Sequence, residues 1–305
     1  MLLRQSAAIL RVIGTSTSAS AWKTNFFKLL VQQLQRESTP IASRARLVGY
    51  ALRLNDPGIQ QLFRQMLSSP YAGIRTLGLL GCAASNNQKA LPEITACLQD
   101  ENEQTRLLSV FALNAIGTSA STQILVEALL NGGEEIRMAA AQAFAMAGGE
   151  GHEILQEAAT YDDLLTRRAT VSGLGLVHDD WTTQLLEKIS VEDGQWVVRN
   201  AASQMLESRG KLEHLHLLPY APLWDQPWLI QFASQKGIGL APGEYPLSLL
   251  LEVIKTGTPV QQHHALFALR RKQSATVSGN LFSLALSMDS QVKDTAAWCL
   301  WCLAA

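Results

Sequence analysis

One helical pattern recurs along this chain at a nearly constant interval, and this repetition limits the possible folds more than any other feature of the sequence. The clearest copy, TRLLSVFALNAIG, runs from Thr105 to Gly117. Related stretches begin at Ile74, Ile136, Thr166, Val198 and Val292. The basic residue of the pattern recurs every 31 residues at Arg44, Arg75, Arg106 and Arg137, then less evenly at Arg167, Arg199 and Lys293. A helical unit repeated at this period predicts a row of stacked helices.

Each copy of the pattern is apolar on more than one side. Counted from Arg106, helical periodicity places Leu113 and Ile116 on one face, while Leu108 and Val110 lie on its two flanks. An ordinary surface helix buries a single stripe, so a helix with three apolar sides needs several neighbours. We therefore expect each such helix to contact a partner in its own repeat and the equivalent helices of the repeats before and after.

The pattern V-R-x-A-A-x-x-A-L-x-x-I-G at this period resembles HEAT repeats, particularly the short bacterial type first named from phycobilin lyases. The resemblance covers most of the chain. It implies an all-α fold, a right-handed α-solenoid of about nine to ten HEAT-like helical hairpins. It does not imply one function, because such arrays serve as scaffolds, adaptors, lyase subunits and nucleic-acid binders.

Repeats of this kind often carry an acidic residue in the turn about six positions before the repeated arginine. Asp100 and Asp193 fit this rule, and Asp162 nearly does. Ser69 and Asn131 stand at the equivalent positions of two other copies. The sequence therefore predicts an interrupted row of Asp–Arg pairs.

We expect residues 1–305 to form one repeat array rather than several globular domains. Its parts differ in regularity: a partial first repeat and a helix in 1–36, regular repeats in 37–210, an irregular part in 211–246 and C-terminal repeats in 247–305. The first helices of the regular pairs are expected near 58–67, 90–98, 122–130, 152–159 and 181–189.

The irregular part, 211–246, combines prolines with aromatic residues. It holds half of the ten prolines, together with Tyr220, Trp224, Trp228 and Tyr245. Because proline inside a helix costs several kcal/mol, helices here must be short. The aromatic residues either fill the gaps left by lost helical turns, or form an exposed edge that contacts a partner.

Composition narrows the function classes. Hydrophobic residues make up 47% of the chain, enough for a continuous core, and a formal net charge of −1 disfavours binding to nucleic acid. No apolar run is long enough to span a membrane. The four cysteines form no disulfide framework, so we expect a reducing, cytoplasmic environment. The acid-free first 24 residues are either a targeting segment or, as we favour, a helix of an incomplete repeat.

The fourth face of the repeated helices should line the concave side of the array, where solenoids usually bind their partners. In the middle of the chain this face is polar, with Arg168, Ser172, Asn200, Gln204 and Glu207. Elsewhere it is apolar, and it predicts a groove for a partner helix or extended peptide. The predicted partner-binding residues are Leu52, Leu80, Leu107, Phe111, Met138, Phe267, Trp298 and Trp301. The alternative is that tight curvature buries this face against its neighbours.

The last helix carries Trp298, Leu300, Trp301 and Leu303 without a polar outer face. Terminal repeats normally end in a hydrophilic surface. We therefore expect this end to contact another chain or a further domain of a longer polypeptide.

No constellation in the sequence predicts catalysis, a metal site or a cofactor. His214 with His216, and His263 with His264, diverge on a helix and lack a third ligand beside them. Cys299 and Cys302 form C-x-x-C inside an apolar helix, where packing is the expected role. HEAT-like deoxyhypusine hydroxylases hold iron with several His-Glu pairs, and here His152-Glu153 alone fits.

The sequence thus predicts a non-enzymatic scaffold or adaptor that binds a partner protein through its concave face. Resemblance to phycobilin lyases leaves a subunit of a bilin lyase-type enzyme as the alternative. HEAT-like DNA glycosylases make nucleic-acid binding a third possibility, which the near-neutral charge disfavours.

Overall fold

The computed structural model describes residues 57–209, 214–215, 227–241, 243–269, 274–287 and 290–304. The predicted first repeat in 1–36, Leu52 and the side chain of Phe267 lie outside this description, as do Tyr220 and Trp224 of the irregular part. The described residues are helical apart from short connections and one pair of two-residue strands, which confirms the predicted all-α class.

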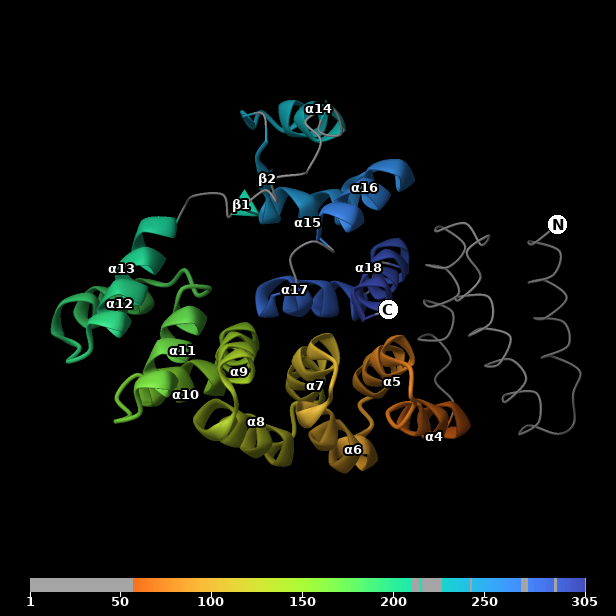
Figure 1. Ribbon diagram of the computed structural model, residues 1–305, viewed down its shortest axis with the longest axis horizontal. Coiled ribbons are helices and arrows are strands. Elements are labelled where there is room, and N and C mark those ends of the chain that lie inside the picture. The colour runs from red at the N-terminus through yellow and green to blue at the C-terminus, as the bar shows by residue number, and fades with distance from the viewer. Residues whose placement is uncertain are drawn as a thin grey trace, which may run out of the picture.

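Residues 57–209 form helix pairs arranged in two rows (Figure 1). The outer row consists of α4 (Pro57–Met66), α6 (Leu91–Ala96), α8 (Ser119–Asn131), α10 (Glu150–Ala158) and α12 (Asp180–Glu192). The inner row consists of α5 (Ala72–Ala84), α7 (Glu103–Ile116), α9 (Glu134–Ala147), α11 (Leu164–Leu174) and α13 (Trp196–Ser208). Two short 3-10 helices, η1 (Gln88–Ala90) and η2 (Cys97–Gln99), flank α6. Every expected first helix overlaps a helix of the outer row.

Local capping explains where inner helices begin and end. Asn102 caps α7 by accepting a hydrogen bond from the backbone N–H of Thr105 at 3.0 Å, and Asp163 caps α11 in the same way through Thr166 at 2.8 Å. Helix α7 ends at Gly117, whose φ of 60° is the left-handed conformation that glycine adopts without steric cost.

Consecutive inner helices pack against one another from α5 to α13. The helices that carry Arg106 and Arg137, α7 and α9, are direct neighbours, as the repeat pattern requires. Small residues permit the close approach of α9 and α11, where a Cβ on Gly173 would lie 2.5 Å from the carbonyl oxygen of Ala141. The predicted stacking is therefore present across these five helices, while the handedness of the array and its extent over 1–305 stay predictions.

The repeated arginines join successive repeats through ion pairs with acids that lie in or just after the next turn. The pairs are Arg75 with Asp100 at 2.6 Å, Arg106 with Glu135, Arg137 with Asp163 at 2.6 Å and Arg167 with Asp193 at 2.8 Å. At Asn131 the row of ion pairs continues, because Glu135, in the first turn of α9, supplies the acid that Asn131 lacks. The interruption predicted at Ser69 stays a prediction, since Arg44 of the preceding repeat lies outside the described residues.

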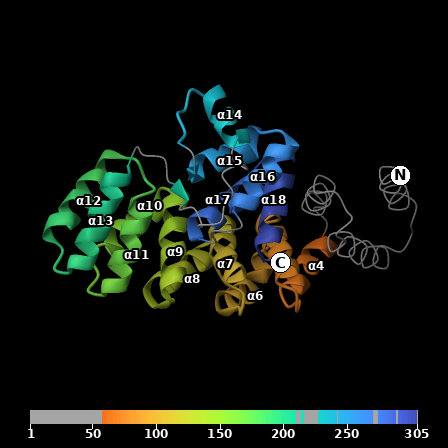
Figure 2. The same ribbon diagram turned by 45° about the horizontal axis from the view of Figure 1, so that its top comes forward.

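The remaining elements lie on the inner side of the curved array (Figures 1 and 2). They are β1 (His214–Leu215), α14 (Pro227–Gln235), β2 (Tyr245–Pro246), α15 (Leu247–Thr256), α16 (Pro259–Leu269), α17 (Ala275–Ala285) and α18 (Ser290–Ala304). The two strands pair antiparallel, with His214 opposite Pro246. The described aromatic residues of the irregular part are packed, since Trp228 stacks on His264 and Tyr245 is buried.

Helices α17 and α18 return to the start of the described array. Helix α18 packs against α5, and α17 packs against α7 and α9. Residues from the end of the chain thus cover the inner face of repeats that precede them by more than 130 residues, as in the hydrogen bond between Gln142 and Thr276. This return was not expected from the sequence, which predicted that the C-terminal repeats would continue the row.

Candidate functional site: the concave face of the array

The face of the inner helices that the curved row turns inward is here called the concave face. It divides into two parts. The covered end, on α5, α7 and α9, lies under α17 and α18, whereas the open end, on α11 and α13, keeps exposed side chains. Figure 1 shows both parts, with α17 inside the curve and α13 beyond it.

Aromatic rings facing glycines close the covered end. The Trp301 ring of α18 lies over Gly73 of α5, where an added Cβ would meet the ring at 3.3 Å. Gly279 of α17 makes room for the Phe111 ring of α7, since a Cβ there would lie 2.6 Å from Phe111 Cζ. Phe282 adds a second ring beside Phe111, at 6.4 Å between centroids. The two surfaces are therefore complementary at atomic contact distance.

Neutral polar side chains complete this contact. Ser278 Oγ donates to Gln104 Oε1 at 2.9 Å, and Gln142 Nε2 donates to Thr276 Oγ1 at 3.1 Å. Both glutamines are buried, and each leaves its other amide atom without a hydrogen-bond partner. The buried hydroxyl of Thr76 on α5 is also unpaired. An unsatisfied buried polar group costs about 1–3 kcal/mol, so the contact is tight but not ideal.

The structure places the predicted partner-binding residues on both sides of this contact. Leu80, Leu107 and Phe111 are buried on the array side, and Trp298 and Trp301 are buried on α18. Met138 is partly buried. The prediction of an apolar groove open to a partner is therefore corrected for these residues. The alternative prediction, that this face is buried, fits these residues, but tight curvature is not the cause. Helices α17 and α18 of the same chain cover the face.

The same finding explains the apolar last helix. Trp298 and Trp301 needed a cover, and the first half of the array provides it within the same chain. Among the described residues, no second chain is required to bury them. Whether this end also contacts another chain or domain stays a prediction.

The open end combines two exposed apolar side chains with polar ones. Trp196, at the start of α13, is 65% exposed, and Leu165, at the start of α11, is 42% exposed. By helical periodicity both lie on the same face as Asn200 and Gln204, which are also exposed. Arg168 on this face pairs with Glu134 at 2.7 Å. Sequence reasoning found the polar residues but missed Trp196 and Leu165, which lie before the repeated arginine.

Arg167 links the two turns beside the open end. Arg167 Nη1 donates to the carbonyl oxygens of Tyr161 and Asp162, both at 2.8 Å, and its Nε donates to Asp193 Oδ2 at 2.8 Å. Exposed Tyr161 and Val191 flank these turns. The apolar residues near the open end thus sit on a backbone fixed by charge-assisted hydrogen bonds.

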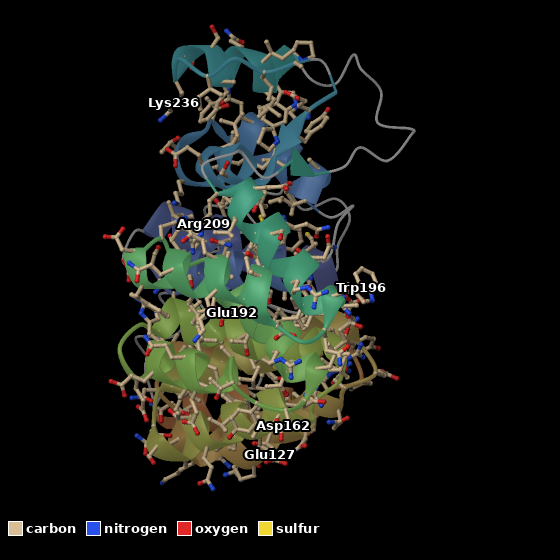
Figure 3. The ribbon with its side chains drawn as sticks, turned by 90° about the vertical axis from the view of Figure 1, so that its left-hand side faces the viewer. Glu127, Asp162, Glu192, Trp196, Arg209 and Lys236 are labelled. Atoms are coloured by element: carbon tan, nitrogen blue, oxygen red, sulfur yellow. The ribbon has the colours of Figure 1, made fainter. Side chains whose placement is uncertain are left out.

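The region around the open end is acidic. Residues 150–209 hold eleven Asp and Glu against five Arg and Lys, a formal net charge of −6. Asp162 is exposed in the turn before α11, and Glu192 is exposed at the end of α12, just before the second turn that Arg167 links; Figure 3 labels both. A cationic ligand would be attracted to this end of the array.

The cysteines and histidines that the sequence raised are described in part, since His216 and the side chains of His214 and His263 lie outside the description. Burial raises the pKa of Cys82 to about 12 and that of Cys97 to about 11, and it also raises the pKa of Cys299, so these thiols stay protonated near neutral pH. His152 Nε2 lies 3.2 Å from the Ala145 carbonyl oxygen. In the described ranges, no three His, Cys, Asp or Glu side chains gather at metal-binding distance.

No helix within the described part of the chain has the length and apolarity needed to cross a lipid bilayer.

Comparison with known proteins gives a family match in the regular repeats. Residues 59–145 match the family model described as HEAT repeats. Comparison with curated proteins gives no match. Among solved structures, human deoxyhypusine hydroxylase in complex with glycerol is similar at 18% identity over 59% of this chain and 73% of that chain, with a TM-score of 0.29. No functional conclusion follows from a likeness at that level.

Proposed function

We propose that this chain is a non-enzymatic scaffold that binds a partner protein at the open end of its concave face, a proposal supported by the match of residues 59–145 to the HEAT-repeat family model. HEAT repeats generally act as protein-interaction scaffolds. The observation that carries the proposal is Trp196, a large aromatic side chain left 65% exposed at the start of α13, on the open end of the concave face.

Exposed aromatic residues are the commonest anchors of protein interfaces, since they bury much area at a low entropic cost. Leu165 adds a second apolar contact, while Asn200 and Gln204 offer hydrogen bonds beside it. The proposed ligand is a helix or extended peptide with an apolar residue to contact Trp196.

The charge of the neighbouring turns specifies the ligand further. Exposed Asp162 and Glu192 favour a ligand with lysine or arginine next to its apolar residues. The same negative charge opposes binding to a phosphate backbone, which requires a basic surface. The proposed partner is therefore a basic amphipathic protein segment rather than a nucleic acid.

Site-specific photo-cross-linking tests this proposal. A photoreactive amino acid replaces Trp196 in one variant and Glu127 in a matched control, since both residues are exposed and Figure 3 shows them well apart. Cross-linked proteins are identified by mass spectrometry, and the candidate partner is purified for titration. We expect cross-links from position 196 and none from position 127.

The titration then compares Trp196→Ala with Glu127→Ala in the full chain. Loss of an aromatic anchor typically weakens binding by about 2 kcal/mol, roughly thirtyfold, whereas the control should bind as the wild type does. Equal cross-linking at both positions, or an unchanged dissociation constant for Trp196→Ala, would contradict the proposed site.

A further inference from the structure

The contact between the C-terminal helices and the array differs in kind from the contacts inside the array. Inside the array, helices approach until backbone meets backbone, as at Gly173 and Ala141, and arginine ion pairs bridge successive repeats. Between the described residues of α17 and the array, the polar contacts are the two neutral hydrogen bonds of Gln104 and Gln142. The described polar contacts of α17 with the array are thus neutral, unlike the ion pairs between repeats, although its apolar residues belong to the same buried cluster as those of the array.

Two buried glutamines and a threonine would gain hydrogen bonds to water if α17 separated from the array. Gln104 and Gln142 each bury an amide atom without a partner, and Thr76 buries its hydroxyl in the same way. Water would satisfy all three groups once the face is uncovered. When the contact opens, these polar groups become hydrated. The free energy gained by hydrating them partly offsets the cost of exposing apolar side chains.

The covered face has the features of a helix-binding site. Phe111 projects from α7 into the space left by Gly279, and Gly73 on α5 forms a seat for the Trp301 ring. Apolar residues at helical spacing surround them, including buried Leu80 and Leu107. A helix reads such a surface through anchors one or two turns apart.

From these observations we infer that α17 and α18 are a detachable cover of a second helix-binding site on α5, α7 and α9. The cover opens as a unit while the array stays folded. The exposed face then takes a helical hairpin of the same chemistry in trans, one that offers a small residue to Phe111 and an aromatic ring to Gly73. Figure 2 shows α17 and α18 against this face in the closed form.

This inference goes beyond the proposed function and does not need the open end to bind anything. The open end is tested at Trp196 on α13, whereas the cover is tested at Gly279 on α17. A Trp196→Ala variant should leave opening of the cover unchanged, so failure of one proposal leaves the other standing.

The first experiment measures hydrogen exchange in the full chain. Gly279→Leu places a side chain against the Phe111 ring and should open the cover, whereas Ser283→Leu adds the same bulk on the exposed side of the same helix. We expect exchange in α17 and α18 to rise at least about tenfold in Gly279→Leu, with protection of α7, α9 and α11 retained. Ser283→Leu should match the wild type.

Two results would overturn the inference. If Gly279→Leu loses protection along α5 to α13 as well, the C-terminal helices are an integral part of the core. If the α17 and α18 amides of Gly279→Leu keep wild-type protection, the contact between Gly279 and Phe111 does not hold the cover closed.

The second experiment tests binding in trans with a fluorescent synthetic peptide of residues 274–304. In the wild type the attached helices compete at an effective concentration in the mM range, so the peptide should bind weakly. In Gly279→Leu the vacated face should bind it at least about tenfold more tightly, and a peptide that itself carries Gly279→Leu should not bind. Equal binding of both peptides, or equal binding to both proteins, would show that the face is not a specific helix site.

Discussion

Arg167 shows how one side chain can hold two neighbouring repeats together. Its guanidinium group binds the carbonyl oxygens of Tyr161 and Asp162 in its own turn and the carboxylate of Asp193 in the next. The side chains of Arg167 and Asp193 are only 14% and 7% exposed. Removing the arginine would leave buried polar groups unpaired, so this contact matters more for stability than an exposed ion pair.

We expect Arg167→Met to lower the free energy of unfolding by about 2–3 kcal/mol, since a largely buried carboxylate loses its partner. Arg168→Met is the matched control on the adjacent residue. Its ion pair with Glu134 is 41% and 57% exposed and should contribute about 0.5 kcal/mol or less. Urea unfolding at pH 7 measures both, and equal losses would contradict the assigned role of Arg167.

The same pair predicts a pH dependence. Burial alone raises the pKa of Asp193, but the Arg167 hydrogen bond, the Gln195 amide and the charges of Arg167 and Arg199 lower the pKa of Asp193 below its usual value. A carboxyl with a lowered folded pKa stabilises the fold above its unfolded pKa of about 4, and this stability is lost as pH falls through the folded pKa.

We therefore expect the stability difference between wild type and Arg167→Met to be largest at pH 7 and to shrink to about 1 kcal/mol or less near pH 3. In the variant, the Gln195 amide and the charge of Arg199 still favour the ionised carboxylate of Asp193, but the hydrogen bond and charge of Arg167 are lost. Urea titrations at a series of pH values give the free energy of unfolding as a function of pH for the wild type and for Arg167→Met. Parallel curves over this range would mean that Asp193 is not coupled to Arg167.

At the scale of an element, close approach between helices depends on residues without side-chain bulk. Gly173 sits inside α11, where glycine normally lowers helix stability relative to alanine by about 1 kcal/mol. It is placed there because a Cβ would collide with the Ala141 backbone at 2.5 Å. Packing of α11 on α9 therefore outweighs local helix propensity.

We expect Gly173→Ala to destabilise the protein by about 1–3 kcal/mol despite the better helix propensity of alanine. Gly194→Ala, in the turn before α13, is the control, since no atom lies within 4 Å of its added Cβ. Thermal unfolding of the two variants should separate them by several degrees. A stabilised Gly173→Ala would mean that the helices can move apart without cost.

The apolar periodicity of the sequence predicted the helices of the array well, because helix formation depends mainly on residues close together in the sequence. The expected helix at 122–130 lies inside α8, and the longer observed helix reflects a capping box between Thr118 and Ser121 that the apolar pattern alone does not show. The row of ion pairs was harder to predict. Glu135 lies at a different position of the repeat from the expected acid at Asn131. A rule based on spacing alone therefore missed it.

The concave face marks the limit of prediction at this scale. Helical periodicity correctly identified a shared face that includes Leu107 and Phe111. It could not identify what covers that face, because the answer depends on contacts with α17 more than 130 residues away. Trp301, on the corresponding face of α18, supplies part of the cover.

At the scale of the whole molecule, charge is unevenly distributed although the net value is only −1. The region of the open end, 150–209, carries a net −6. Long-range attraction to a basic partner should accelerate association, and added salt should screen it.

We expect the association rate constant of the identified partner to fall about tenfold between 50 mM and 500 mM NaCl, with a smaller change in the dissociation rate constant. Surface plasmon resonance or stopped-flow fluorescence measures both. Trp196→Ala should instead raise the dissociation rate constant, because it removes a short-range apolar contact and leaves the long-range electrostatic attraction unchanged. An association rate independent of salt would exclude a basic partner at the acidic end.

The distance along the chain between the covered face and its cover has a consequence for biosynthesis. Gln104 and Ser278, which bond in the finished protein, are 174 residues apart. At about 5–20 residues per second, a ribosome needs roughly 10–35 s to translate that interval. Throughout that time α17 and α18 are not yet made, so we expect the face that carries Leu107 and Phe111 to be accessible to molecular chaperones until the last helices emerge.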